Sequence, residues 1–141
     1  MGLRILSTNT FTYMFPYKRV DITVLYNTIA RNLQESGVRT NIGLSGAAGE
    51  WQGITGENRV IYISERGLFT MFITVCYTQK HVQIQICYAP QLKSKVYSDS
   101  AHTMRYSQWD MCINSTFDAI KSAVNEIMGK PVSESEEVID F

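Results

Sequence analysis

The chain has 141 residues, of which 45% are hydrophobic, so it is long enough to form one domain with its own core. Thirteen basic and thirteen acidic residues cancel, which argues against a strongly charged nucleic-acid or membrane binder. The cancellation is uneven, because residues 131–141 contain four acidic residues and no basic one. We therefore expect a single, mildly cationic globular domain over residues 1–130 and an acidic C-terminal tail over residues 131–141.

Cysteine and apolar patterns limit the compartment and the chemistry. Three cysteines cannot all pair within one chain, which favours a reducing environment. No CxxC or HxxxH spacing is present, so we expect neither a metal nor a cofactor. The longest apolar run, residues 68–77, is too short to cross a bilayer, which takes about 20 residues. The start of the chain shows no signal peptide, and we expect a cytoplasmic protein without membrane contact.

The first third of the chain predicts a strand, a helix and a second strand. Residues 3–15 alternate loosely between apolar and polar side chains, and Pro16 follows where a strand would end. Asp21 is a good N-cap for a helix over residues 21–36, and Gly37 stands where the helix should stop. Residues 38–44 have the composition of a strand.

Residues 43–56 contain five of the nine glycines of the chain. A backbone with so few side chains can approach a phosphate closely, and its N–H groups can bind an anion. However, the segment has neither phosphate-binding glycine motif and no Lys or Arg. The composition favours a loop, with an anion-binding loop as the alternative.

Two successive hairpins fit residues 59–88. A turn at Gln79 and Lys80 aligns apolar residues across the second hairpin on one face, which is typical of a half-buried antiparallel pair. The expected pairs are Tyr77 with Val82, Val75 with Ile84, Ile73 with Ile86, and Met71 with Tyr88. The strand over residues 59–64 has two possible registers, which bury either Val60 and Tyr62 or Ile61 and Ile63.

The remaining residues predict a polar connection over residues 89–106 and a second helix. Ser107 is the expected N-cap, apolar residues follow at helical spacing, and Gly129 and Pro131 end the helix. Two helices with one apolar stripe each would cover the apolar face of the sheet. The expected fold is α+β, a two-layer sandwich with an antiparallel sheet of about five strands and two amphipathic helices on one face.

The polar face of the second hairpin is the candidate binding surface. Phe72 lies there among Thr, Gln and His side chains, and an exposed aromatic ring can stack on a nucleic-acid base. The same face could instead be solvated, or could pack against a second subunit with Phe72 as the anchor. The candidate ligand-binding residues are Phe72, Lys80, His81, Gln83, Gln85, Lys93, Lys95 and Arg105.

No pattern indicates a catalytic site. His81 and His102 are the two histidines, and neither lies in a motif typical of an activated nucleophile. Carboxylates are missing from the predicted strands, so paired acid–base catalysis is not expected either. A hydrolase that uses His81 or His102 remains a third class of function.

The chain ends in an acidic run followed by Val138, Ile139, Asp140 and Phe141. This ending resembles the acidic C-terminal tip of bacterial and phage single-stranded DNA-binding proteins, although it has Asp140 where that family has proline. The resemblance covers about eight residues and implies that Ile139, Asp140 and Phe141 dock on a partner protein. A solubilising acidic tail is the alternative.

Together these patterns predict a non-enzymatic, cytoplasmic binding protein that forms homo-oligomers. Single-stranded nucleic acid is the favoured ligand. The alternative is a module that binds a protein or a small anionic ligand, in a chaperone, immunity or sequestration role.

Overall fold

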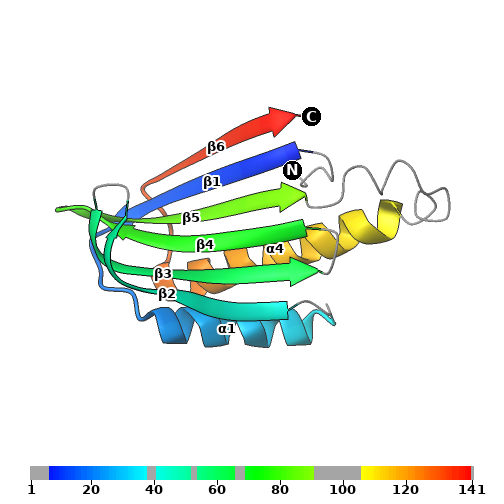
Figure 1. The fold of residues 1–141 in the computed structure, drawn as a ribbon, viewed down its shortest axis with the longest axis horizontal. Coiled ribbons are helices and arrows are strands. Elements are labelled where there is room, and N and C mark those ends of the chain that lie inside the picture. Colours follow the sequence, from blue (N-terminus) through cyan, green and yellow to red (C-terminus); the bar gives the residue numbers. More distant parts are fainter. Residues whose placement is uncertain (1–6, 38–40, 52–53, 66–68, 91–105, 141) are drawn as a thin grey trace.

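The computed structural model describes residues 7–37, 41–51, 54–65, 69–90 and 106–140. In chain order the elements are β1 (Ser7–Pro16), α1 (Ile22–Glu35), β2 (Asn41–Trp51), β3 (Ile54–Glu65), β4 (Phe69–Tyr77), β5 (His81–Pro90), α4 (Tyr106–Met128) and β6 (Ser133–Asp140). The strands form one six-stranded antiparallel sheet in the order β2-β3-β4-β5-β1-β6. Both helices lie on the same face of this sheet (Figure 1).

This arrangement confirms the predicted α+β two-layer sandwich, with one more strand than expected. The additional strand is the acidic segment, which pairs antiparallel with β1 from Ser7 opposite Asp140 to Met14 opposite Ser133. Residues 133–140 are therefore an edge strand of the sheet and not a tail outside it. Their sequence hides this role, because its run of acidic side chains is typical of a solvated segment.

The pairing of β4 with β5 follows the predicted register. Val75 lies opposite Ile84, Ile73 opposite Ile86 and Met71 opposite Tyr88, and Cys76 lies opposite Gln83. The apolar members of these pairs are almost wholly inaccessible and form the centre of the core beneath the helices. The period of two in the side-chain direction therefore separates a dry face from a polar face along these two strands.

The neighbouring strand β3 takes the second of its two possible registers. Ile61 lies opposite Ile73 and Ile63 opposite Met71, and both isoleucines are fully buried. Glu65 lies opposite Phe69, so three residues, 66–68, separate the paired positions. Consequently Tyr62 lies on the face that points away from the helices, opposite Phe72.

The glycine-rich segment was expected to be a loop, and this prediction is wrong. Most of residues 43–56 belong to β2 and β3, with Gly49 opposite Gly56 and Gly43 opposite Tyr62. A Cβ atom at Gly43 would overlap Cζ and the hydroxyl oxygen of Tyr62. Glycine at this position lets the tyrosine ring lie flat across the neighbouring strand, which is a packing role that composition alone does not reveal.

Helix α1 begins and ends as predicted. The Asp21 carboxylate accepts hydrogen bonds from the backbone N–H groups of Thr23, at 2.9 Å, and Val24, at 3.3 Å. Gly37 has a φ of 72°, a left-handed conformation that glycine adopts without a steric penalty. The buried side of α1 consists of Ile22, Leu25, Ile29 and Leu33.

Helix α4 begins at Tyr106, so Ser107 lies within its first turn. The prediction that Ser107 is the N-cap is therefore wrong. Gly129, with a φ of 78°, follows its last turn as expected. The two helices lie side by side on the sheet (Figure 1). The Asn32 amide donates to the carbonyl oxygen of Ala119, at 3.2 Å, and Arg31 pairs with Glu126, at 2.7 Å. The hydrogen bond from Asn32 is part-buried. The Arg31–Glu126 ion pair is exposed and contributes little to stability.

The one-sided burial of β5 predicts different costs for two adjacent substitutions. Ile84→Ala should lower the free energy of unfolding by about 2 to 5 kcal/mol, because it leaves a cavity in the packed core. Gln85→Ala, on the opposite face, should cost less than about 0.5 kcal/mol in the monomer. Chemical denaturation of both variants, at concentrations where the protein is monomeric, measures the difference. Equal destabilisation by the two substitutions would contradict the register.

Candidate functional site

The sheet face that points away from the helices is called the open face below. Rows of directly opposed residues cross it, and one row runs from Gly43 through Tyr62, Phe72, Cys87 and Thr10 to Glu137. The open face carries Thr8, Thr10, Thr12, Met14, Tyr62, Thr70, Phe72, Thr74, Cys76, His81, Gln83, Gln85, Cys87, Ser133, Ser135, Glu137 and Ile139. Among these residues Glu137, on the edge strand, is the one carboxylate, and none is Lys or Arg.

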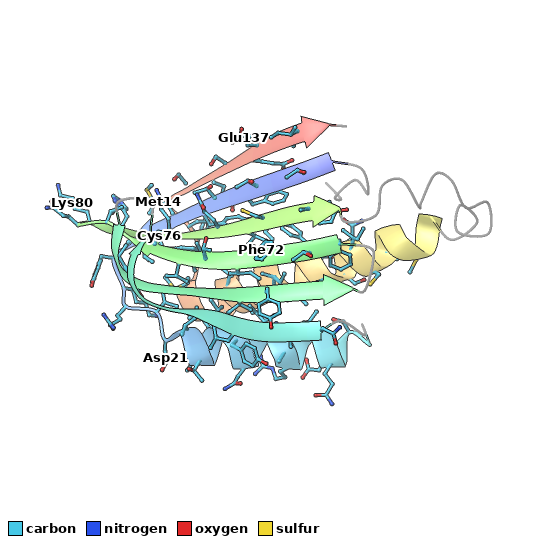
Figure 2. The ribbon with its side chains drawn as sticks, in the orientation of Figure 1. Met14, Asp21, Phe72, Cys76, Lys80 and Glu137 are labelled. Atoms are coloured by element: carbon cyan, nitrogen blue, oxygen red, sulfur yellow. The ribbon has the colours of Figure 1, made fainter. Side chains whose placement is uncertain are left out.

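Two aromatic rings stand next to each other on this face. Phe72 is 42% exposed and its cross-strand partner Tyr62 is 37% exposed, although both lie near the middle of the sheet. Figure 2 shows Phe72 on β4, on the side of the sheet away from α1 and α4. Phe72 was predicted from the alternation of β4. Tyr62 was missed, because the sequence left the register of β3 open.

Parts of the open face are nearly inaccessible although no helix covers them. Thr70, Thr74 and Cys76 each expose less than a tenth of their surface. Among the described residues, Oγ1 of Thr74 is buried without a hydrogen-bond partner. Burial also raises the pKa of the Cys76 thiol, which keeps it protonated and unreactive. These parts of the open face are therefore less accessible to water than a row of threonines on an uncovered sheet would be.

Of the predicted ligand-binding residues, four come together on the open face. Phe72, Gln83 and Gln85 lie in its middle, and half-buried His81 lies at the start of β5. Gln85 approaches Thr12, with 3.5 Å between Nε2 and Oγ1. Lys80 is exposed in the turn between β4 and β5, at the end of the sheet (Figure 2). Lys93, Lys95 and Arg105 lie outside the described residues.

His81 takes part in a tight turn at the start of β5. The Thr78 hydroxyl accepts from the backbone N–H of His81, at 3.0 Å, and donates to its carbonyl oxygen, at 3.1 Å. These contacts close the turn through the backbone, and the hydroxyl is not directed at the imidazole. His102 lies outside the described residues.

The predicted docking tip is part of β6 up to Asp140. Ile139 is 56% exposed and lies opposite Thr8 on the open face. The side chain of Asp140 and the whole of Phe141 lie outside the described residues. Docking by this tip stays a prediction.

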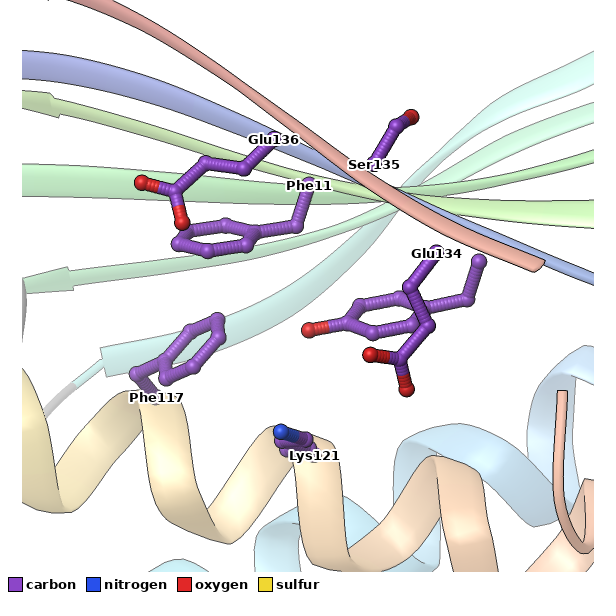
Figure 3. A pocket seen from close by; sticks show the side chains of 7 residues that line it. Phe11, Phe117, Lys121, Glu134, Ser135 and Glu136 are labelled. Carbon is purple, nitrogen blue, oxygen red and sulfur yellow. The ribbon is translucent and has the colours of Figure 1, made fainter. Parts of the chain in front are cut away.

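A pocket that the sequence did not reveal lies on the other face of the sheet, between β6 and α4. It has a volume of about 270 Å³ and is lined by Phe11, Tyr13, Phe117, Lys121, Glu134, Ser135 and Glu136 (Figure 3). The rings of Phe11 and Phe117 are 4.6 Å apart between centroids and form its apolar wall. No sequence signal could have found this pocket, because it depends on the pairing of residues 133–140 with β1.

The pocket combines two carboxylates with one ammonium group. Asn9 holds Glu136 through a hydrogen bond of 3.2 Å, and Nζ of Lys121 lies 6.0 Å from the centroid of the Tyr13 ring. Tyr13 is only 5% exposed, and its hydroxyl makes no hydrogen bond to another described residue. Burial, together with the nearby charges of Glu134 and Glu136, raises the pKa of Tyr13 to about 12. The phenol therefore stays neutral above pH 10, where an ordinary tyrosine loses its proton, and can donate a hydrogen bond while it is neutral.

The described ranges contain neither a cluster of metal ligands nor a membrane-spanning helix. No group of three or more His, Cys, Asp or Glu residues there could hold a metal ion. Neither helix in those ranges has the length and hydropathy needed to cross a membrane.

The raised pKa of Tyr13 predicts a loss of stability at high pH. The folded-state pKa, about 12, lies above the ordinary value of 10.0, so the folded protein holds this proton more tightly than the unfolded chain does. The resulting stability is complete below pH 10 and is lost as the pH rises towards 12, by up to about 3 kcal/mol. Urea denaturation of the wild type and Tyr13→Phe from pH 9 to 12 measures this loss. The difference between the two proteins should change over that range. A constant difference from pH 9 to 12 would contradict the assignment.

Comparison of the sequence with protein-family models found no match, and comparison with curated proteins found no significant match.

Proposed function

We propose that this chain is a non-enzymatic protein-binding module, and that its open face is an interface occupied by a second copy of the chain. The observation that carries the proposal is the neutrality of this face. Apart from Glu137 at the edge, its described residues carry no fixed charge, and they surround two exposed aromatic rings. Depletion of charge around aromatic anchors is typical of the centre of protein interfaces.

A second copy is the partner that this surface fits best. Two identical charged faces would repel each other, whereas two neutral faces meet without an electrostatic penalty. Amide and hydroxyl groups both donate and accept hydrogen bonds. The amides of Gln83 and Gln85 and the hydroxyls of Thr10 and Thr12 in one copy can therefore hydrogen-bond to the same groups in the other copy. Phe72 and Tyr62 supply the apolar area that would be buried at the centre.

Single-stranded nucleic acid is the second candidate, favoured by the pairing of Tyr62 with Phe72. Two neighbouring exposed rings can stack on successive bases, and each stacked base is worth about 1 to 3 kcal/mol. Phosphate binding also needs cations. Among the described residues the open face offers only His81 with neighbouring Lys80, and Glu137 would oppose the phosphates. Electrostatics therefore places this candidate second.

The test is the oligomeric state of Phe72→Glu, measured by sedimentation over a range of concentrations. The wild type should dimerise, and the glutamate should raise the dimer dissociation constant about thirty-fold or more, because it puts a charge at the desolvated centre. The matched control is Val24→Glu, which places the same charge on α1 at a residue that is 49% exposed, away from the open face. Val24→Glu should dimerise like the wild type.

Two outcomes would contradict the proposal. The first is a wild type that stays monomeric at all concentrations tested. The second is a dimer that Phe72→Glu leaves intact. If a monomeric wild type instead binds a single-stranded oligonucleotide at low salt, and Phe72→Ala weakens that binding, the nucleic-acid candidate replaces the self-interface.

A further inference from the structure

The second surface with a chemical character of its own is the outer edge of β6. This strand is the last in the sheet, so its outward backbone N–H and C=O groups have no strand partner among the described residues. Such an edge is a template for a further strand. Its sequence, SESEEVID, contains four acidic residues and no basic one. A segment that pairs here is stabilised if it carries positive charge and destabilised if it carries negative charge.

The carboxylates of β6 are divided between the two faces in a definite way. Glu134 lies opposite Tyr13 and Glu136 opposite Phe11, so both point to the helix side, where they line the pocket. Glu137 lies opposite Thr10 on the open face. Figure 3 shows Glu134 and Glu136 extending from β6 over the space above Phe117 and Lys121 on α4.

The pocket beneath these carboxylates is suited to a positively charged group. Its lining holds two carboxylates against the single ammonium group of Lys121, and Glu134 makes no ion pair with another described residue. The faces of Phe11 and Phe117 can stabilise a cation through their electron-rich rings. Tyr13, which is 5% exposed as a residue, adds its phenol to the same wall.

We propose that β6 and this pocket bind an extended cationic segment of a partner protein, which adds to the sheet as a seventh strand. Lys or Arg at alternate positions of the segment would face Glu134 and Glu136, at the distance of about 4.5 to 5.5 Å between opposed Cβ atoms. The side chains between them would face Ser135 and Glu137 on the open face. Backbone hydrogen bonds supply affinity in this mode of binding, and alternate side chains supply specificity.

A second copy of β6 does not fit this edge. In an antiparallel pair of two β6 strands, a register centred on Glu136 or on Glu137 would bring that carboxylate directly opposite its own copy, which destabilises a pair of strands. The negative charge of the edge therefore disfavours pairing with a second β6 and favours pairing with a basic segment. The pocket lies on the opposite side of the sheet from Phe72, so the two proposals can be tested with separate variants.

The experiment uses two fluorescently labelled peptides of the same composition. One alternates lysine and threonine over eight residues, and the other has four lysines followed by four threonines. Fluorescence anisotropy should show that the wild type binds the alternating peptide more tightly than the block peptide. Binding should weaken as the salt concentration rises, because exposed charges are screened.

The matched variants are Glu134→Lys and Glu137→Lys, which make the same charge change on opposite faces of the same strand. Glu134→Lys should weaken binding of the alternating peptide by about two- to thirty-fold, since it replaces an attractive cross-strand pair by a repulsive one. Glu137→Lys should have a smaller effect, because threonine would lie opposite it. Phe72→Glu, on the open face, should bind the peptide like the wild type.

Hydrogen exchange of the wild type provides a readout that needs no variant. Bound peptide should protect the β6 amides that point away from β1, because they gain strand partners. Three results would overturn the proposal: no binding of either peptide at low salt, equal weakening by Glu134→Lys and Glu137→Lys, or peptide binding without protection of β6. In each case the acidic edge would serve only to prevent sheet-to-sheet aggregation.

Discussion

The alternation of side chains along β4 and β5 is the constraint on which the other parts of this structure depend. Ile73, Val75, Ile84 and Ile86 point to one face and are almost wholly buried, so both helices must pack there. Core burial of this kind is the dominant favourable contribution to folding. Because both helices cover the same face, the other face is uncovered and consists of Thr and Gln side chains and the two exposed rings. The surface proposed as an interface is therefore a consequence of how the core is built.

The helices also cover less of the sheet than its full width, and this produces the second surface. On β1 the core side includes Tyr13, which is buried, whereas Glu134, directly opposite it on β6, is exposed. Carboxylates can occupy the helix side of β6 because that strand extends past the packed core and stays in contact with water. The pocket between β6 and α4 arises where the sheet continues and the helical layer does not. Its charge and the neutrality of the open face suit different partners.

Much of the fold could be predicted from the sequence, because it rests on local patterns. The register of β4 with β5, the bounds of α1 and the use of one face by both helices follow from side-chain period, an N-cap and a glycine stop. What failed depends on partners distant in the sequence. Residues 133–140 become a strand only by pairing with β1, and Gly43 lies in a strand where the ring of Tyr62 takes the place of a side chain. For the same reason Phe72 was found from sequence, whereas Tyr62 and the pocket were not.

The most direct measurement of the central claim, that the open face is an interface between two copies, uses the natural cysteines. Cys87 is half-buried on the open face in the row of Phe72, and Cys112 is half-buried on α4. We would measure the alkylation rate of each thiol as the protein concentration rises, with mass spectrometry to assign the site. The account predicts that Cys87 reacts more slowly in proportion to the fraction of protein assembled, while the rate at Cys112 stays constant. A Cys87 rate that is independent of concentration, or equal slowing at both thiols, would contradict it.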